Sequence, residues 1–415
     1  MKPAPSALSR LRTRGVVLDL IRSARTISRV ELVDGAGLTG ATITNVVREL
    51  IDDGLVIEVG RGASTGGKPR TLLELNASAR YAVGVQLDRG SAVVVVLDLA
   101  GQLVARTALG GSGTRSPHDY LLVVAEHVNA LLATTGIDRE KIIGIGLVSH
   151  GPQDRTEGRL QIDAPTADWL NYPLVADLEE ILHLPVLLDN DATAAAIGEF
   201  WLGGVHPAST YGSIYMASGI GGGVVVAGEA YRGASSNGVE IGHISLDVNG
   251  ELCGCGNRGC VEGFAGPPAT IDAAQAVPGL AARLGLTGDR DNTVADFARI
   301  GRAAASGDGE AHALIETSAR YLGHAAVTLA NLFDLDRIVL AGPSFTTAGS
   351  IYLRGVQAEL EKAAFIRRVR PVTAMLSASG ANAAAVGGAV LVLKSELTPM
   401  SRQQPDGRAL NYTFS

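Results

Sequence analysis

The three cysteines of this 415-residue chain, Cys253, Cys255 and Cys260, lie within a span of eight residues, and His243 precedes the first of them by ten positions. Three thiolates and one imidazole make a tetrahedral ligand set that suits zinc and leaves no coordination position open. Three neighbouring thiols gathered by chance are the weaker interpretation. We therefore predict one structural zinc ion per chain, because a closed ligand shell cannot activate water.

The cysteine segment is part of a longer pattern, Glu240-x-x-His243 followed by Gly250-x-x-Cys-x-Cys-Gly-x-x-Gly-Cys-x-Glu262. This pattern resembles the signature of the ROK family (repressors, open reading frames, kinases), including its NagC/XylR-like branch. The resemblance reaches from the N-terminal helices to Ala383–Ala389. It implies an α/β chain with a two-lobed, actin-like sugar-kinase (ribonuclease H-like) body, in which His243 and the three cysteines are the zinc ligands.

The same resemblance implies a sugar site. Asn190 and Asp191 match the family's sugar-binding asparagine and its catalytic aspartate, and Glu240, His243 and Glu262 match residues that contact sugar hydroxyls. The chemistry agrees, since carboxylates and amides pair well with vicinal hydroxyls. Because Glu262 ends the cysteine segment, a zinc ion bound there would also fix the position of this carboxylate.

The nucleotide site of the family's kinases is altered here. Those kinases carry an Asp-x-Gly-Gly-Thr turn in the first β-hairpin, and the matching segment is Gln86–Ser91. Gln86 replaces the carboxylate that helps to handle the metal-bound nucleotide, and Asp88 and Arg89 replace the glycines that let phosphate approach. Their side chains block that approach, and the Asp88 carboxylate repels phosphate.

Two further segments concern catalysis. Ser218–Gly223 keeps much of the second phosphate loop, whereas Leu340–Ser344 contains Pro343, which has no backbone N–H to donate. We therefore predict that the chain is not an enzyme and that Asp191 accepts a hydrogen bond from a sugar hydroxyl; an active ATP-dependent sugar kinase is the alternative. Thr166, where family members often have a sugar-contacting asparagine, predicts a ligand or an orientation different from that of a common hexose.

Residues 9–78 predict a DNA-binding unit. Two helices are expected over 30–39 and 40–54, joined by a tight turn, with Thr39 as the N-cap of the second. The second helix has one apolar stripe with helical spacing, formed by Ile43, Val46, Val47, Leu50 and Ile51. Its other face presents hydrogen-bonding side chains suited to base edges in the major groove, namely Thr42, Thr44, Asn45 and Arg48.

Two short strands, expected over 55–60 and 70–75, flank a basic loop that could serve as a wing. Its candidates for phosphate or minor-groove contacts are Arg61, Lys68 and Arg70. Charge supports this interpretation weakly, since residues 1–80 carry a net +4 and the remainder a net −11. We predict a winged helix-turn-helix rather than a helical hairpin used only for packing.

The rest of the chain predicts two lobes, 80–190 and 191–382, the first completed by a helix over about 383–397. Three consecutive strands at 80–87, 91–98 and 103–109 are followed by alternating helices and strands, which indicates a mixed sheet flanked by helices. The longest apolar runs are strand-sized, and the N-terminus lacks the apolar region of a secretory signal. We therefore expect a cytoplasmic protein without membrane contact.

Together these features predict a transcriptional repressor of carbohydrate-metabolism genes, whose operator affinity changes when a sugar or sugar phosphate binds between the lobes. A palindromic operator would make it a homodimer or a dimer of dimers. The alternative to a sugar effector is a protein partner acting on a repressor with a vestigial pocket.

Overall fold

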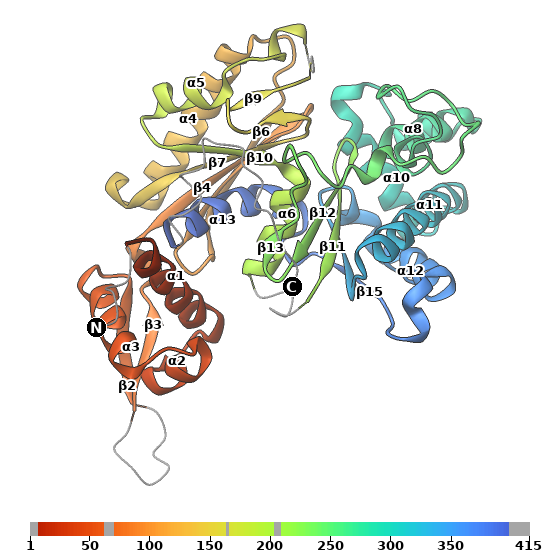
Figure 1. Cartoon of the computed structure of the whole chain (residues 1–415). Helices are drawn as coiled ribbons and strands as arrows, with labels where there is room; N and C mark the ends of the chain where they lie inside the picture. Colours follow the sequence, from red (N-terminus) through yellow and green to blue (C-terminus); the bar gives the residue numbers. More distant parts are fainter. Residues whose placement is uncertain (1–6, 62–69, 163–165, 203–208, 398–415) are drawn as a thin grey trace.

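The computed structural model of the protein describes residues 7–61, 70–162, 166–202 and 209–397. Figure 1 shows a small N-terminal unit and two larger lobes beside each other. Each lobe is built on a five-stranded sheet with helices packed against it. The predicted two-lobed α/β architecture is therefore confirmed.

The N-terminal unit combines three helices with a three-stranded antiparallel sheet of order β1-β3-β2. Its elements are α1 (Ala7–Ala24), β1 (Ile27–Ser28), α2 (Arg29–Ala36), α3 (Gly40–Asp52), β2 (Val56–Arg61) and β3 (Thr71–Leu75). The hydroxyl of Thr39 accepts a hydrogen bond from the backbone N–H of Thr42, which confirms the predicted N-cap of α3. The sequence analysis did not predict α1.

The predicted apolar stripe of α3 faces the core of this unit. Ile43, Val46, Val47 and Leu50 are buried, and Ile51 is half-buried. They share one hydrophobic cluster with residues of α1 and of the first lobe, so the N-terminal unit packs directly on the body of the molecule.

The first lobe has a mixed sheet of order β10-β7-β4-β5-β6. Its strands are β4 (Tyr81–Leu87), β5 (Ser91–Asp98), β6 (Leu103–Gly110), β7 (Ile142–Ser149) and β10 (Val186–Asn190). Helices α4 (Pro117–Thr135) and α5 (Leu174–Leu182) cover one face, and α13 (Ala383–Leu397) covers the other. Gly84 is required for this packing, because a Cβ there would lie 1.8 Å from the carbonyl oxygen of Ala385.

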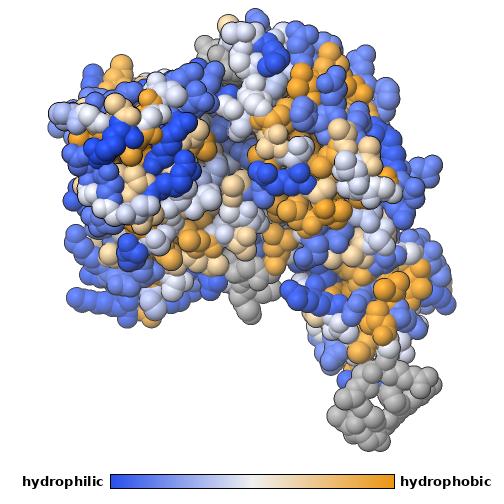
Figure 2. Space-filling view, turned by 180° about the vertical axis from the view of Figure 1, so that it is seen from behind, coloured by the Kyte–Doolittle hydropathy of each residue, from blue (hydrophilic) through white to orange (hydrophobic). Residues whose placement is uncertain are grey.

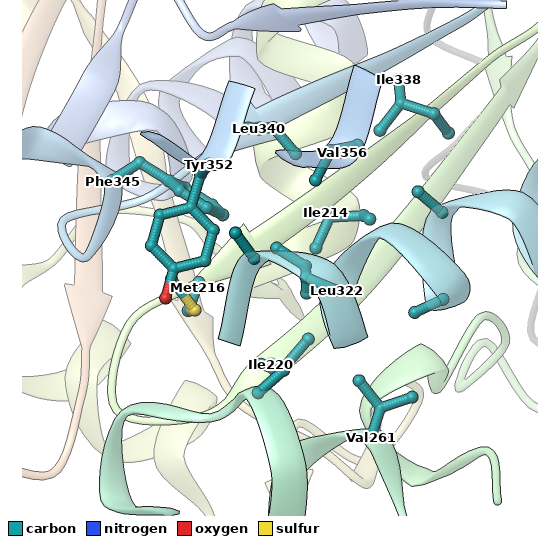
Figure 3. Packing of buried hydrophobic residues seen from close by; sticks show 14 of the residues in the cluster. Ile214, Met216, Ile220, Val261, Leu322, Ile338, Leu340, Phe345, Tyr352 and Val356 are labelled. Carbon is teal, nitrogen blue, oxygen red and sulfur yellow. The ribbon is translucent and has the colours of Figure 1, made fainter. Parts of the chain in front are cut away.

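The second lobe has a sheet of order β13-β12-β11-β14-β15. Its strands are β11 (Tyr211–Met216), β12 (Ile220–Val226), β13 (Glu229–Ala230), β14 (Arg337–Ala341) and β15 (Thr373–Leu376). Its helices are α7 (Val261–Ala265), α8 (Pro267–Ala276), α9 (Leu280–Leu284), α10 (Thr293–Ala305), α11 (Gly309–Phe333) and α12 (Phe345–Ala363). Figure 3 shows its core, in which Ile214 and Met216 of β11 face Leu322 of α11 and Tyr352 of α12.

Helix α6 (Asp191–Trp201) lies between the two sheets and beside α13 (Figure 1). The two helices touch closely, since a Cβ at Gly387 would lie 1.9 Å from the carbonyl oxygen of Ala194. Ala196 belongs to a cluster with Tyr211 and Val225 of the second lobe, so α6 contacts both halves of the body.

Short elements complete the described chain. They are β8 (Gln153–Asp154), β9 (Arg159–Leu160), and the 3-10 helices η1 (Ala77–Ala79), η2 (Arg139–Lys141), η3 (Ala167–Trp169), η4 (Ile241–His243), η5 (Arg290–Asn292), η6 (Phe365–Arg368) and η7 (Gly380–Asn382). Among the described helices, none has the length and apolar character needed to cross a bilayer.

Figure 2 shows hydrophobic surface on the N-terminal unit, where Val16, Val30, Ile57 and Val59 are exposed.

Candidate functional site

A cavity of about 610 Å³ lies between the lobes. Every residue predicted to bind sugar lines it, namely Asn190, Asp191, Glu240, His243 and Glu262. They come from the β10–α6 junction, from η4 and from α7, so the fold brings together residues that are up to 72 positions apart in sequence.

The β10–α6 junction positions two of these side chains. Asn190 is the N-cap of α6 and accepts a hydrogen bond from the backbone N–H of Thr193 at 3.0 Å through Oδ1, which leaves its NH₂ group for a ligand. Asp191 is the first residue of the helix, and its Oδ1 accepts from the N–H of Ala192 at 2.8 Å.

Asp191 is an unusual carboxyl group. Its side chain is buried, and this desolvation raises its pKa to about 7, with the carboxylates of Asp88 and Glu240 adding to the rise. The group is therefore about half ionised near neutral pH. It can accept a hydrogen bond from a hydroxyl when ionised and donate one when protonated.

Glu262 is fixed by the segment that precedes it. Cys260 is the N-cap of α7, and Glu262 follows in the first turn of that helix. The Oε1 atom of Glu262 accepts a hydrogen bond of 2.8 Å from the backbone N–H of Ile220. This carboxylate thus links α7 to the glycine-rich strand β12.

The cysteine segment and η4 form a cluster with the geometry of a metal site. The ligand atoms of His243, Cys253, Cys255 and Cys260 all lie within 4.8 Å of one another. Cys255 Sγ lies 3.7 Å from Cys260 Sγ, and Cys253 Sγ lies 3.7 Å from His243 Nδ1. A tetrahedral ion with metal–sulfur bonds of about 2.3 Å separates its ligands by roughly this distance. The four residues therefore fit a metal ion.

The β4–β5 turn contacts the second lobe through side chains. Ser218 Oγ donates a hydrogen bond of 2.6 Å to Asp88 Oδ1, and Gln86 Nε2 donates one of 2.5 Å to Tyr215 Oη. Arg89 Nε lies 2.9 Å from Asp291 Oδ1. These interlobe contacts occupy the segment that the sequence analysis identified as an altered phosphate loop.

Several cavity residues were missed by the sequence analysis. His150, Tyr215, Arg290 and Thr293 also line the cavity. His150 directly follows β7, and a position just after the carboxyl end of a parallel strand could have signalled it. Burial lowers the pKa of His150 and favours its neutral form.

Thr166 is not among the residues that line the cavity. It precedes η3, and its buried hydroxyl has no hydrogen-bond partner among the described residues. The neighbouring residues 164 and 165 lie outside the described part of the chain.

The predicted DNA contacts of α3 lie on its outer face. Thr44, Asn45 and Arg48 are exposed, whereas Thr42 is half-buried and contacts the cap residue Thr39. Arg48 NH2 donates to Asn45 Oδ1 at 2.9 Å, so these two side chains are aligned. Of the predicted wing residues, Arg70 is exposed, the side chain of Arg61 is not described, and Lys68 lies outside the described residues.

Residues 82–396 match a family model described as the ROK family. The chain is 30% identical over 393 residues to a putative xylose repressor of Caldicellulosiruptor sp. (strain Rt8B.4), covering 92% of this chain and 95% of the relative. It is 28% identical over 347 residues to the DNA-binding transcriptional dual regulator NagC of Escherichia coli (strain K12), covering 82% of each.

Two solved structures are similar in fold. A ROK family transcriptional regulator, described as a homologue of the E. coli MLC protein, has a TM-score of 0.72 at 24% identity and covers 94% of this chain and 98% of its own. A ROK family glucokinase from Streptomyces griseus, solved with glucose and AMPPNP, has a TM-score of 0.63 at 28% identity and covers 75% of this chain and 98% of its own.

Proposed function

Because this chain belongs to the ROK family, we propose that it is a DNA-binding transcriptional repressor of carbohydrate-metabolism genes that responds to a sugar. The observation that carries this proposal is the 30% identity to a putative xylose repressor over 92% of the chain, since a match of that length must include at least part of the N-terminal unit. The glucokinase, by comparison, matches 75% of the chain.

In this proposal the interlobe cavity binds the sugar. The NH₂ group of Asn190 and the carboxyl groups of Asp191, Glu240 and Glu262 bind its hydroxyls. His243 has Nδ1 beside Cys253, which leaves Nε2 for a further hydroxyl.

We propose that the metal is one structural zinc ion, held by His243 and the three cysteines. When bound, zinc supplies a fixed position for η4 and for the start of α7 rather than Lewis-acid chemistry. Glu262, two residues after Cys260, is then positioned for ligand binding.

The N-terminal unit is proposed to bind operator DNA as a winged helix-turn-helix. Helix α3 would enter the major groove with Thr42, Thr44, Asn45 and Arg48, and Arg61, Lys68 and Arg70 would contact the backbone or the minor groove. A palindromic operator requires two copies of this unit, so we propose a homodimer or a dimer of dimers. We also propose that the protein acts in the cytoplasm, where its operator DNA would be.

Helix α6 connects the proposed sugar site to the N-terminal unit. It begins at Asp191 in the cavity and ends at Trp201, about 15 Å away at 1.5 Å per residue. The guanidinium of Arg22, on α1, lies over the Trp201 ring and donates to the Trp201 carbonyl oxygen. A shift of α6 on sugar binding would therefore move α1. The sugar acts because it binds the arrangement before this shift and the arrangement after it with different affinities.

Fluorescence anisotropy of the full chain on DNA from upstream of its own gene tests the proposal. The titration uses a panel of sugars at fixed salt, because phosphate contacts make affinity strongly salt-dependent. Release of the DNA by one sugar is the expected result. Tight DNA binding that no sugar changes would instead favour control by a protein partner.

A sugar kinase is the second candidate, because the S. griseus glucokinase shares the fold and binds AMPPNP. The contacts of Gln86 and Asp88 with the second lobe argue against it, since they occupy the turn through which the nucleotide would enter. Sugar-dependent ATP hydrolysis above the rate of an Asp191→Asn variant would support the kinase.

A further inference from the structure

One loop of the second lobe reaches across to the first lobe beside the cavity. Residues 231–239, here called the bridging loop, follow β13 and lead directly into the cavity residue Glu240. The loop closes on itself, because the backbone N–H of Gly238 donates a hydrogen bond of 3.2 Å to the carbonyl oxygen of Arg232. Two of its side chains, those of Arg232 and Asn237, contact the first lobe.

The first contact is an ion pair between Arg232 and Asp189, a buried residue of β10. Arg232 NH1 donates to Asp189 Oδ1 at 2.9 Å, and NH2 lies 2.8 Å from Oδ2, so the guanidinium faces both carboxylate oxygens. Asp189 Oδ1 also accepts a hydrogen bond of 2.9 Å from the backbone N–H of Asn190, which lines the cavity. Arg232 therefore holds the carboxylate that in turn holds the backbone of Asn190.

The second contact joins Asn237 to the backbone of Gln153 on β8. Asn237 Oδ1 accepts from the N–H of Gln153 at 2.7 Å, and Nδ2 donates to the carbonyl oxygen of Gln153 at 2.9 Å. The Gln153 side chain is buried, and its Nε2 donates to the carbonyl oxygens of Ser149 and Asp189 at 2.7 and 3.0 Å. The bridging loop is thus tied by two routes to the end of β10, where Asn190 stands.

The backbone just before Glu240 has an unusual conformation. Val239 has a φ of 67°, in the left-handed region that a β-branched residue rarely adopts. Ser236 also has a positive φ, 63°, and its hydroxyl accepts from Arg155 NH1 of the first lobe at 3.4 Å. Because such conformations persist only where the surrounding structure holds them, the course of the chain into Glu240 depends on the contacts of the loop.

We propose that Arg232 and Asn237 are positioning residues of the ligand site. They fix Glu240 of the second lobe relative to Asn190 of the first, although neither is among the described residues that line the cavity. The inference rests on the proposed function and adds to it two residues that act on the ligand through others. Because the chain itself holds Asn190 and Glu240 in place, the ligand does not have to order them, and its affinity is higher for that reason.

Hydrogen exchange of the full chain, measured without ligand, tests the connection between the lobes. In Arg232→Ala we expect the amides of residues 186–192, in the first lobe, to exchange at least about fivefold faster, together with those of 236–243. Arg283→Ala removes an arginine that pairs with two carboxylates within the second lobe, and this matched control should change neither segment. Faster exchange confined to 236–243 would overturn the proposal.

Calorimetry with D-xylose, D-glucose and N-acetylglucosamine as probes measures the effect on the ligand site. We expect Arg232→Ala and Asn237→Ala to bind at least about fivefold more weakly than the wild type, and Arg283→Ala to bind as the wild type does. Wild-type affinity in Arg232→Ala overturns the inference and leaves a sugar-responsive repressor. Binding of none of the three sugars by a wild type that still binds its operator contradicts the sugar-responsive part of the proposed function; hydrogen exchange then decides the inference by itself.

Two further measurements separate positioning from a general loss of stability. A merely stabilising Arg232 would lower the urea unfolding midpoint in Arg232→Ala without changing the dissociation constant of the folded protein. Arg232→Lys keeps the charge beside Asp189 but cannot match both carboxylate oxygens, so we expect an affinity between those of Arg232→Ala and the wild type.

Asn237→Ala leaves the buried ion pair intact and serves where Arg232→Ala does not fold. The N–H of Gln153 loses its acceptor in this variant, so we expect at least about fivefold faster exchange over residues 149–155 of the first lobe. Wild-type exchange there, with wild-type sugar affinity, would overturn the role of Asn237.

Discussion

The guanidinium carbon of Arg22 lies 4.1 Å from the centroid of the Trp201 ring, and its NH1 donates to the Trp201 carbonyl oxygen. Arg22 also forms an ion pair with Asp19 at 2.8 Å, which holds the guanidinium in place. These contacts join α1 of the N-terminal unit to the end of α6. The other end of α6 lies in the interlobe cavity, so one helix touches both the cavity and the N-terminal unit that is proposed to bind DNA.

Replacing Trp201 by leucine should weaken the coupling between sugar and DNA. The change removes a partly buried cation–π contact, which is worth about 0.5–2 kcal/mol. We expect the effect of sugar on the DNA dissociation constant to shrink about 2- to 30-fold, while sugar affinity in the absence of DNA stays within about twofold. Anisotropy with and without sugar measures both. Arg29→Ala, an arginine paired with Glu58 within the same unit, is the matched control and should retain the coupling.

Removal of the metal should impair sugar binding more than DNA binding. Cys253→Ser replaces one ligand of the cluster and should loosen the segment that positions Glu262. Outer-shell partners of a metal site change metal affinity or activity by about 10- to 100-fold, and we expect the loss of sugar affinity to fall in the same range. Calorimetry after chelation and after re-addition of zinc provides the check. Sugar affinity that survives chelation would contradict a role of the metal in shaping the cavity.

The raised pKa of Asp191 predicts a stability that falls as pH rises. The folded protein holds this proton up to about pH 7, whereas the unfolded chain releases it near its ordinary pKa of 3.8. Between these values the folded state binds more protons than the unfolded state, so the free energy of unfolding decreases with increasing pH. The stabilising contribution is complete below about pH 4 and lost above about pH 7.

Asp191→Asn should therefore increase the free energy of unfolding at pH 8 while weakening sugar binding. The rise of the Asp191 pKa from 3.8 to about 7 sets an upper bound on the order of 4 kcal/mol for the gain, and none is expected at pH 4. Urea unfolding of wild type and variant at both pH values measures the difference. A gain equal at pH 4 and pH 8 would exclude titration of this carboxyl group as the cause.

Substitutions on the outer face of α3 should separate base contacts from phosphate contacts. Asn45→Ala should cost about 1–3 kcal/mol on the operator and relax specificity at one base pair, because an asparagine there can pair with a base edge. Arg70→Ala should weaken binding to all sequences alike and reduce the slope of log K against log salt by about 1. Anisotropy on operator and scrambled DNA at several salt concentrations distinguishes the two. Equal losses on both DNAs for Asn45→Ala would contradict a base contact.

Local patterns in the sequence determined much of the secondary structure. The stripe of Ile43, Val46, Val47 and Leu50 fixes α3 and its buried face, because helical spacing of apolar residues needs no information from the rest of the chain. The strands expected at 80–87, 91–98 and 103–109 are β4, β5 and β6, with bounds that agree to within one residue. The spacing of the cysteines also indicates a metal site, since its ligands lie within 18 residues.

Only the tertiary structure decided which distant residues meet. Asp88 and Ser218 are 130 positions apart, and Arg22 and Trp201 are 179 apart, so no local period relates them. The family resemblance indicated that the β4–β5 turn cannot hold a nucleotide in the usual way. It did not indicate that Asp88 accepts a hydrogen bond from the hydroxyl of Ser218 in the second lobe. Such pairs depend on how α6, α13 and the two sheets pack, and that packing is a cooperative property of buried surfaces throughout the chain.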